Sequence, residues 1–166
     1  GANKRIVFCD TLLKGLKADE VEAVLAHELG HFRHGHVRKR LLYKAVTSLA
    51  AFALLGILID ADWFYTGLGL QHPTHAGAFL LFLLAAPYFT APLRPLSSYW
   101  MRKHEFEADD FAATTTGAQN LIHALVKLDQ ENAATLTPDA LYSAYHDSHP
   151  PPPIRIAHLA AKIGTP

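Results

Sequence analysis

Two long stretches without charge constrain the fold of this chain more than any other feature. Residues 45–59 contain no charged side chain, and an apolar run at 41–43 extends them upstream. Residues 76–93 are also uncharged, although Pro87 and Pro92 interrupt them. A helix that spans a membrane needs roughly 20 apolar residues, so both stretches are of borderline length. They predict either a transmembrane helical hairpin or a pair of helices buried in a protein core.

The distribution of charge around the two stretches favours a transmembrane hairpin over a pair of core helices. The segment between the two stretches, residues 60–75, contains no Lys or Arg. Basic residues lie on the outer flanks, with Arg33, Arg38, Lys39, Arg40 and Lys44 before the hairpin and Arg94, Arg102 and Lys103 after it. Basic residues of short loops stay on the cytoplasmic side of a membrane. We therefore expect an integral membrane protein with both flanks, and any site built from them, on the cytoplasmic side.

The remaining segments predict a mainly α-helical chain. Arg5–Asp10 is typical of a short strand, and an apolar pattern of helical spacing runs from Ala18 to about Lys44. Further helices are expected at residues 97–114, 120–132, 138–145 and 154–163. We interpret residues 1–44, 45–93 and 94–166 as three parts of one domain: a strand with a first long helix, the apolar hairpin, and a C-terminal helical segment.

Composition excludes two broad classes of protein. The formal net charge is zero, so no strongly basic surface indicates nucleic-acid binding. The single cysteine, Cys9, cannot form an internal disulfide. Only 18% of the residues are charged, which agrees with the long apolar stretches.

The sequence His27-Glu28-Leu29-Gly30-His31 has the pattern of a zinc-binding helix. Residues four apart on a helix differ by about 40° in direction, so both histidines can bind one zinc ion. Glu28 would then lie beside the metal, where it can act as a general base. The alternative is one core histidine and one surface histidine without a metal.

A catalytic zinc ion needs a third protein ligand. His34 is a poor choice because successive turns of one helix climb about 5.4 Å, and we expect His34 and His36 on a polar helix surface. Glu105 and Asp109 are four residues apart and share a helix face. One of them could bind zinc while the other orients a histidine ligand. The neighbouring Glu107 and Asp110 are expected in a solvated acidic patch.

A third polar cluster follows near the C-terminus. It consists of His146-Asp147-Ser148-His149-Pro150, with Arg155 beyond it. His149 and Arg155 could bind an oxyanion or a peptide backbone near the metal. Helix capping by Asp147 or Ser148 would explain part of the same pattern.

These motifs, in this order, resemble those of the CAAX prenyl protease family of integral-membrane zinc endopeptidases, which have a zincin-like fold of the gluzincin type. The resemblance rests on Asn3–Leu13, on Val24–His31, on Arg102–Asp109 and on Ser148–Pro151 with Arg155. The family pattern SRxxExxAD is matched except that Met101 replaces the serine. The resemblance implies one zinc ion held by His27, His31 and Glu105, with Glu28 as general base, Asp109 orienting a ligand, and His149 and Arg155 near the substrate.

The resemblance also implies a substrate class, contact with membrane lipid and further segments of the same protein. The expected substrate is a peptide or protein, with a prenylated C-terminus in this family, and membrane lipid surrounds the hairpin. Family members have further transmembrane helices before the segment seen here, so the chain is expected to be the C-terminal catalytic part of a longer enzyme and a poor enzyme alone. The alternatives are a heat-shock-type membrane quality-control metalloprotease, a periplasmic metalloprotease with chaperone activity, and a non-catalytic membrane scaffold, which would not need Glu28.

Overall fold

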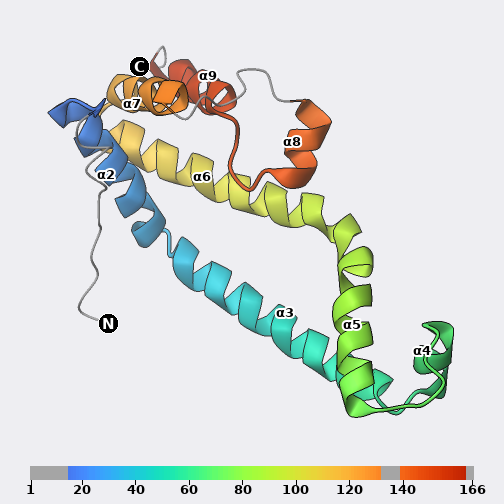
Figure 1. The fold of residues 1–166 in the computed structure, drawn as a ribbon. Coiled ribbons are helices and arrows are strands. Elements are labelled where there is room, and N and C mark those ends of the chain that lie inside the picture. Colours follow the sequence, from blue (N-terminus) through green and yellow to red (C-terminus); the bar gives the residue numbers. More distant parts are fainter. Residues whose placement is uncertain (1–14, 132–138, 164–166) are drawn as a thin grey trace. The chain divides into compact units, whose positions relative to one another are not determined.

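The computed structural model describes residues 15–131 and 139–163, which are almost entirely helical (Figure 1). The chain divides into two compact units, Gly1–His36 with Pro95–Pro166 and Val37–Arg94. The prediction of a mainly α-helical fold with two apolar helices is confirmed. The strand predicted at Arg5–Asp10 lies outside the described residues.

The first unit is built from helices that precede and follow the apolar hairpin in sequence. It contains α2 (Ala18–Arg33), most of α6 (Arg94–Thr116), α7 (Ala118–Glu131), α8 (Ala140–His146) and α9 (Pro152–Ile163). Apart from the end of α2, these bounds agree with the helices predicted from periodicity to within a few residues. Helix α7 packs against both α2 and α9.

Alanine and leucine side chains fill the core of this unit where α2, α6, α7 and α9 meet. The buried residues of the core are Ala23, Ala26, Ala112, Leu121, Leu125 and Leu159. Because the alanine side chain is short, two helices that meet at alanines can pack with their backbones close together. Helices α2 and α6 can therefore approach each other closely. This close approach brings polar side chains of the two helices within reach of each other.

An ion pair ties the start of α2 to α7. The buried Glu20 carboxylate accepts a hydrogen bond from Lys127 Nζ at 2.6 Å and another from the backbone N–H of Lys17 at 2.7 Å. The hydrogen bond from Lys127, followed by that from Lys17, lowers the pKa of Glu20 below its ordinary value of 4.5. The folded protein therefore favours the ionised form of Glu20.

This linkage predicts how stability depends on pH. Because the folded-state pKa of Glu20 is lowered, its contribution is complete above about pH 4.5 and is lost as the pH falls through the folded value. Glu20→Gln should therefore lower the melting temperature at pH 7, and the difference from wild type should shrink as the pH falls below 4.5. Glu22→Gln, an exposed change on the same helix, is the control and should show no such trend. A difference that grows at low pH would contradict the prediction.

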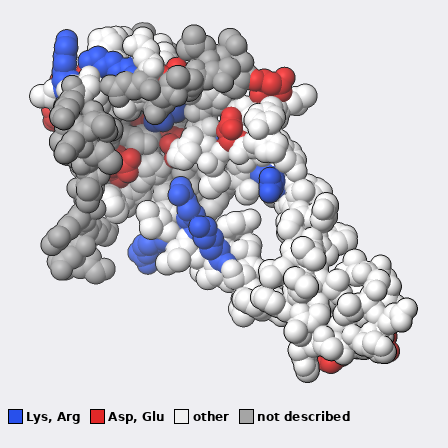
Figure 2. Space-filling model, viewed as in Figure 1, with Lys and Arg blue, Asp and Glu red and all other residues white. Residues whose placement is uncertain are grey.

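The second unit holds the two apolar stretches. It contains most of α3 (His36–Leu58), then α4 (Asp62–Gly67), α5 (His75–Thr90) and the 3-10 helix η1 (Ala91–Leu93). Helix α3 and the continuous helical run His75–Thr116 are long and apolar enough to cross a membrane. On the face shown in Figure 2, the surface formed by α4 and α5 is almost free of charged side chains.

The apolar side chains of α3 and α5 mostly point outward. Leu49 and Ile57 on α3 are 73% and 72% exposed, and Phe89 on α5 is 80% exposed. A soluble protein rarely exposes apolar surface over such a length. The alternative of two helices buried in a core therefore gains no support from the described residues.

The apolar helices meet at one end, next to α4 (Figure 1). There Leu55 of α3, Phe64 and Tyr65 of α4 and Ala78 of α5 form a small buried cluster. The Tyr65 hydroxyl donates to the carbonyl of Ile59 at 2.7 Å, so the ring is held across the turn. The sequence predicted only a connecting segment here and missed α4.

The prediction of one continuous helix from Ala18 to about Lys44 is wrong. Helix α2 ends at Arg33, and α3 begins at His36. Gly35 lies between them with φ = 67°, a left-handed conformation that glycine adopts at little cost. The interruption changes where His36 lies relative to α2.

Candidate metal centre

Helix α2 presents the two histidines of the predicted motif on one face. The Nε2 atoms of His27 and His31 lie 3.2 Å apart, and their rings meet edge to face. His27 is buried, and His31 is half-buried. This arrangement follows from the four-residue spacing, which places the two side chains one turn apart.

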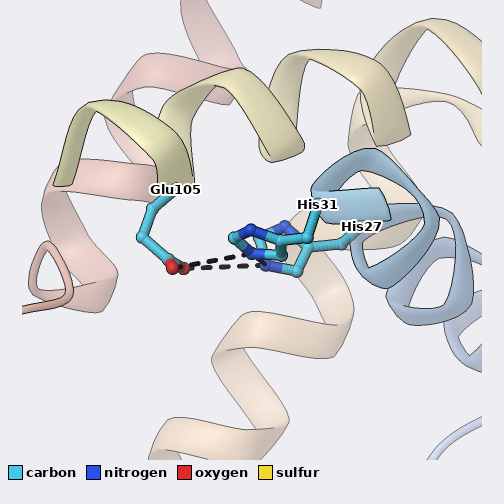
Figure 3. A group of neighbouring side chains, drawn as sticks. All are labelled: His27, His31 and Glu105. Atoms are coloured by element: carbon cyan, nitrogen blue, oxygen red, sulfur yellow. Dashed lines mark hydrogen bonds and ion pairs between the residues drawn. The ribbon is translucent and has the colours of Figure 1, made fainter. Parts of the chain in front are cut away.

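Helix α6 supplies a carboxylate that faces both imidazoles (Figure 3). One oxygen of Glu105 lies 3.6 Å from Nε2 of His27, and the other lies 3.5 Å from Nε2 of His31. The Glu105 side chain is only 3% exposed. The three donor groups converge, and each can direct one ligand atom to a common point.

The spacing of these atoms fits a zinc ion. Ligand atoms about 2.0–2.1 Å from a tetrahedral zinc ion lie about 3.3–3.4 Å from one another. The distances of 3.2, 3.5 and 3.6 Å among His27, His31 and Glu105 are close to that value. Two imidazoles and one carboxylate are also a donor set of catalytic zinc sites, which keep a fourth position open.

Gly30 sets the distance between α2 and α6. A Cβ atom on Gly30 would lie 3.0 Å from Cα and 3.1 Å from the carbonyl oxygen of Ala108. Both neighbours are backbone atoms, which cannot move without shifting α6. The glycine of the motif therefore permits the approach that brings Glu105 to the histidines.

Gly30→Ala should destabilise the protein and weaken metal binding together. Overpacking of this kind typically costs about 1–3 kcal/mol, and any shift of α6 moves Glu105 away from the histidines. Thermal unfolding and zinc titration of the detergent-solubilised protein measure the two effects. The matched control is Gly56→Ala in α3, where an added Cβ atom meets nothing within 4 Å. Equal behaviour of the two variants would contradict the role given to Gly30.

Asp109 orients His27 from one turn further along α6. Its Oδ1 atom lies 2.8 Å from Nδ1 of His27, so the imidazole donates its N–H there and presents Nε2 to the metal position. Arg155 of α9 holds the same carboxylate with two donors, Nε to Oδ2 at 2.8 Å and an Nη to Oδ1 at 2.5 Å. Asp109 is completely buried, so this fork compensates its charge.

Glu105 and Asp109 both stay ionised at neutral pH. Burial raises the pKa of Asp109, but hydrogen bonds from Arg155 and His27 outweigh it and hold the pKa below its ordinary value. Burial likewise raises the pKa of Glu105, and hydrogen bonds from His149 and His27 outweigh it, so this pKa also lies well below its ordinary value. An ionised Glu105 is the form that binds a metal cation.

His149 reaches the cluster from the segment after α8. Its Nδ1 atom lies 3.1 Å from a Glu105 oxygen, while its side chain is 65% exposed. Arg102 of α6 holds the C-terminal part of α8, just before this segment, by donating to the carbonyl oxygens of Ser143 and Ala144 at 3.1 and 3.2 Å. An arginine at the end of a helix also suits the negative end of its dipole. His149 is thus held at the solvent-exposed side of the cluster.

The predicted site residues differ in how closely they approach the three candidate ligands. The structure brings together the three ligand candidates His27, His31 and Glu105 with Asp109, His149 and Arg155. Arg155 is directed mainly at Asp109, and its Nη1 atom is 4.0 Å from Glu105. Glu28 is half-buried on α2 beside His27, and its carboxylate interacts electrostatically with the guanidinium group of Arg155.

Among the expectations about neighbouring polar residues, the one for His36 is wrong, and the one for Glu107 and Asp110 is borne out only in part. His36 does not lie on a polar surface, because only 1% of it is exposed and its Nε2 atom is 2.9 Å from Glu107. The side chains of Glu107 and Asp110 are 33% and 40% exposed, so both lie partly at the surface, but each also has an ion-pair partner. Glu107 pairs with His36, and Asp110 pairs with His158 and Lys162, each at 2.6 Å. Periodicity missed the contact of His36 because the predicted helix continued through Gly35. It could not predict the contact of Asp110 with His158, which lies 48 residues away in the chain.

Comparison with known proteins agrees with these motifs. The model of peptidase family M48 matches residues 1–163. CAAX prenyl protease 1 of Saccharomyces cerevisiae is 32% identical over 163 residues, which cover 89% of this chain and 36% of the yeast protein. The CAAX prenyl protease 1 homolog of Arabidopsis thaliana is 36% identical over 154 residues, covering 90% of this chain and 35% of that protein. The chain thus spans about a third of the length of these relatives.

A solved structure gives the same result. The crystal structure of S. mikatae Ste24p matches with a TM-score of 0.80 and 29% identity, covering 90% of this chain and 38% of that one. The resemblance to the CAAX prenyl protease family predicted from the sequence is confirmed. The chain belongs to peptidase family M48.

Proposed function

We propose that this chain holds the zinc centre of an integral-membrane metalloendopeptidase of the CAAX prenyl protease type. The observation that carries the proposal is the convergence of His27, His31 and Glu105 at spacings that fit one zinc ion. Membership of family M48 supports peptide-bond hydrolysis as the reaction. Residues 1–44 and 94–166 would contribute the site, and residues 45–93 would anchor it, as parts of one catalytic domain.

The residues of the chain divide the proposed chemistry among them. A zinc ion held by His27, His31 and Glu105 would supply a Lewis acid for the carbonyl of the scissile bond. The Glu28 carboxylate would take a proton from the attacking water and pass it to the leaving amine. Asp109 would keep the His27 ring oriented.

His149 and Arg155 have different places in this proposal. The exposed His149 ring borders Glu105 and would face the substrate, where it can donate to a developing oxyanion. Arg155 has a 13% exposed side chain and two donors engaged by Asp109. Its geometry supports positioning of Asp109, and contact with the oxyanion stays a prediction.

We propose that α3 and α5 span a membrane, with the metal centre on the cytoplasmic side. The apolar side chains that point outward from both helices would contact lipid acyl chains. Basic residues flank the hairpin, and the connecting residues 60–75 contain none. A periplasmic metalloprotease would not need this asymmetry.

The names of the relatives suggest a substrate class. Both curated relatives described above are called CAAX prenyl protease 1 or its homolog. We propose a protein substrate with a prenylated C-terminus, cleaved near that end. The alternative with the same site chemistry is quality control of membrane proteins, in which the prenyl group would not matter.

A matched pair of peptides tests the proposal. The full-length protein in detergent micelles is incubated with one C-terminal peptide in farnesylated and in unmodified form, and products are identified by mass spectrometry. We expect cleavage near the C-terminus of the farnesylated peptide, at least tenfold faster than that of the unmodified one. A zinc chelator should stop the reaction, and added zinc should restore it.

Two outcomes would contradict parts of the proposal. Equal cleavage of both peptides, together with cleavage of an unfolded membrane protein, would favour quality control. Chelator-resistant cleavage would exclude the metal mechanism altogether.

A further inference from the structure

His31 contacts a second histidine through the ring nitrogen that does not face Glu105. Its Nε2 atom is directed at the metal position (Figure 3), while its Nδ1 atom lies 2.9 Å from Nδ1 of His36. On a continuous helix, residues five apart lie about 140° from each other and cannot meet in this way. The contact exists because Gly35, with φ = 67°, ends α2 and turns the chain so that His36 returns to His31.

The contact of the other ring nitrogen of His36, Nε2, determines which nitrogen of His36 and of His31 carries a proton. It lies 2.9 Å from a carboxylate oxygen of Glu107, and an ionised carboxylate only accepts hydrogen bonds. Nε2 of a neutral His36 therefore carries the proton, and its Nδ1 atom is an acceptor. His31 must then donate from Nδ1, which leaves the lone pair of its Nε2 atom directed at the metal position.

The rest of the pocket keeps His36 in this orientation. The ring is 1% exposed and stacks on His104, with centroids 4.1 Å apart and planes within 14°. His104 and Glu107 both lie on α6, the helix that also supplies Glu105. One element thus carries a candidate ligand and the groups that hold His36.

We propose that His36 and Glu107 are positioning residues for the metal ligand His31. They would do for His31 what Asp109 does for His27, namely fix the ring orientation and the tautomer that binds metal. The proposal rests on the zinc centre proposed above and adds two residues to it.

A second cation at His34, His36 and Glu107 is the competing interpretation, because their donor atoms also lie close together. A cation there would take the lone pair of His36 Nε2 and move the proton to Nδ1. That proton would then face Nδ1 of His31, which could no longer donate. His34 is also exposed, so it adds little to a closed site. These contacts favour positioning over metal binding.

Zinc affinity of the holoprotein, measured by competition with a chromophoric chelator, tests the proposal. His36→Leu should weaken zinc binding about 10–100-fold, the range typical of lost outer-shell partners. His36→Gln should stay within about threefold of wild type, because its amide can accept from His31 and donate to Glu107. Glu107→Ala should lie between them. Circular dichroism and melting temperature confirm that each variant is folded.

A control variant and a second measurement distinguish the positioning role of His36 from a second cation site. His34→Ala should leave both zinc affinity and stoichiometry unchanged. In metal-free wild type, nitrogen NMR of labelled histidine should show His31 protonated at Nδ1, a readout that does not depend on activity.

Three results would overturn the positioning role. The first is that His36→Leu and Glu107→Ala both bind zinc with wild-type affinity. The second is that His31 carries its proton on Nε2 in a metal-free protein that is able to bind zinc. The third is a second zinc equivalent that disappears in His34→Ala, which would assign a metal site instead. A wild-type protein that binds no zinc would overturn the proposed zinc centre itself, and the positioning role with it.

Discussion

Replacement of Glu105 by alanine should leave the protein unable to retain zinc and without peptidase activity. Among the described residues, Glu105 is the carboxylate that faces the Nε2 atoms of both His27 and His31. Without it, two ligands from one helix would remain, fewer than a catalytic zinc site requires. The positive charge of Arg155, 4.0 Å from Glu105, would also oppose a cation that no carboxylate compensates. The loss of affinity should therefore exceed the roughly 10–100-fold that follows loss of an outer-shell partner.

Metal analysis after dialysis against graded chelator concentrations measures this loss. Asp110→Ala is the matched control, because Asp110 lies on the same helix but pairs with His158 and Lys162. It should retain wild-type zinc. Asp109→Ala should lie between the two, since it removes the partner of a ligand and not a ligand. Unchanged zinc content in a folded Glu105→Ala protein would exclude Glu105 as the third ligand.

Much of the fold follows from patterns that act over a few residues. Helical periodicity and the length of the apolar stretches predicted the helices at residues 97–114, 120–132 and 154–163 and the two apolar helices, and the structure bears them out. The break at Gly35 was not predictable in this way. A single glycine inside a helical pattern can continue the helix or end it, and the choice depends on tertiary contacts such as the burial of His36.

The candidate site shows the same division between local and long-range information. The spacing of His27 and His31 predicted by itself that they share a face, because one helix carries both. Spacing could not choose between Glu105 and Asp109, which share a face of α6. The choice depends on how α6 packs against α2, and the contact of Gly30 with Ala108 sets that packing. The pairing of His36 with Glu107 was missed because it joins residues 71 apart in the chain.

Glu28→Gln should abolish most of the peptidase activity while zinc binding stays intact. Glutamine has nearly the same size and shape as glutamate, so the α2 helix and the two histidines should keep their places. The amide has no basic oxygen that can take a proton from the attacking water. General acid–base groups typically contribute about 10²–10⁴-fold to the rate. We therefore expect kcat to fall by at least about 10²-fold, with little change in KM.

The separation of activity from metal content makes this prediction specific. Glu22→Gln is the matched control, an exposed glutamate five residues before His27 on the same helix, and it should keep full activity. A Glu28→Gln protein that loses zinc would show that Glu28 supports the metal site and is not only a base. A variant that keeps zinc and more than a tenth of wild-type kcat would exclude Glu28 as the principal base. In that case another proton acceptor near Glu105 would have to act, and the exposed His149, 3.1 Å from that carboxylate, is the group to replace next.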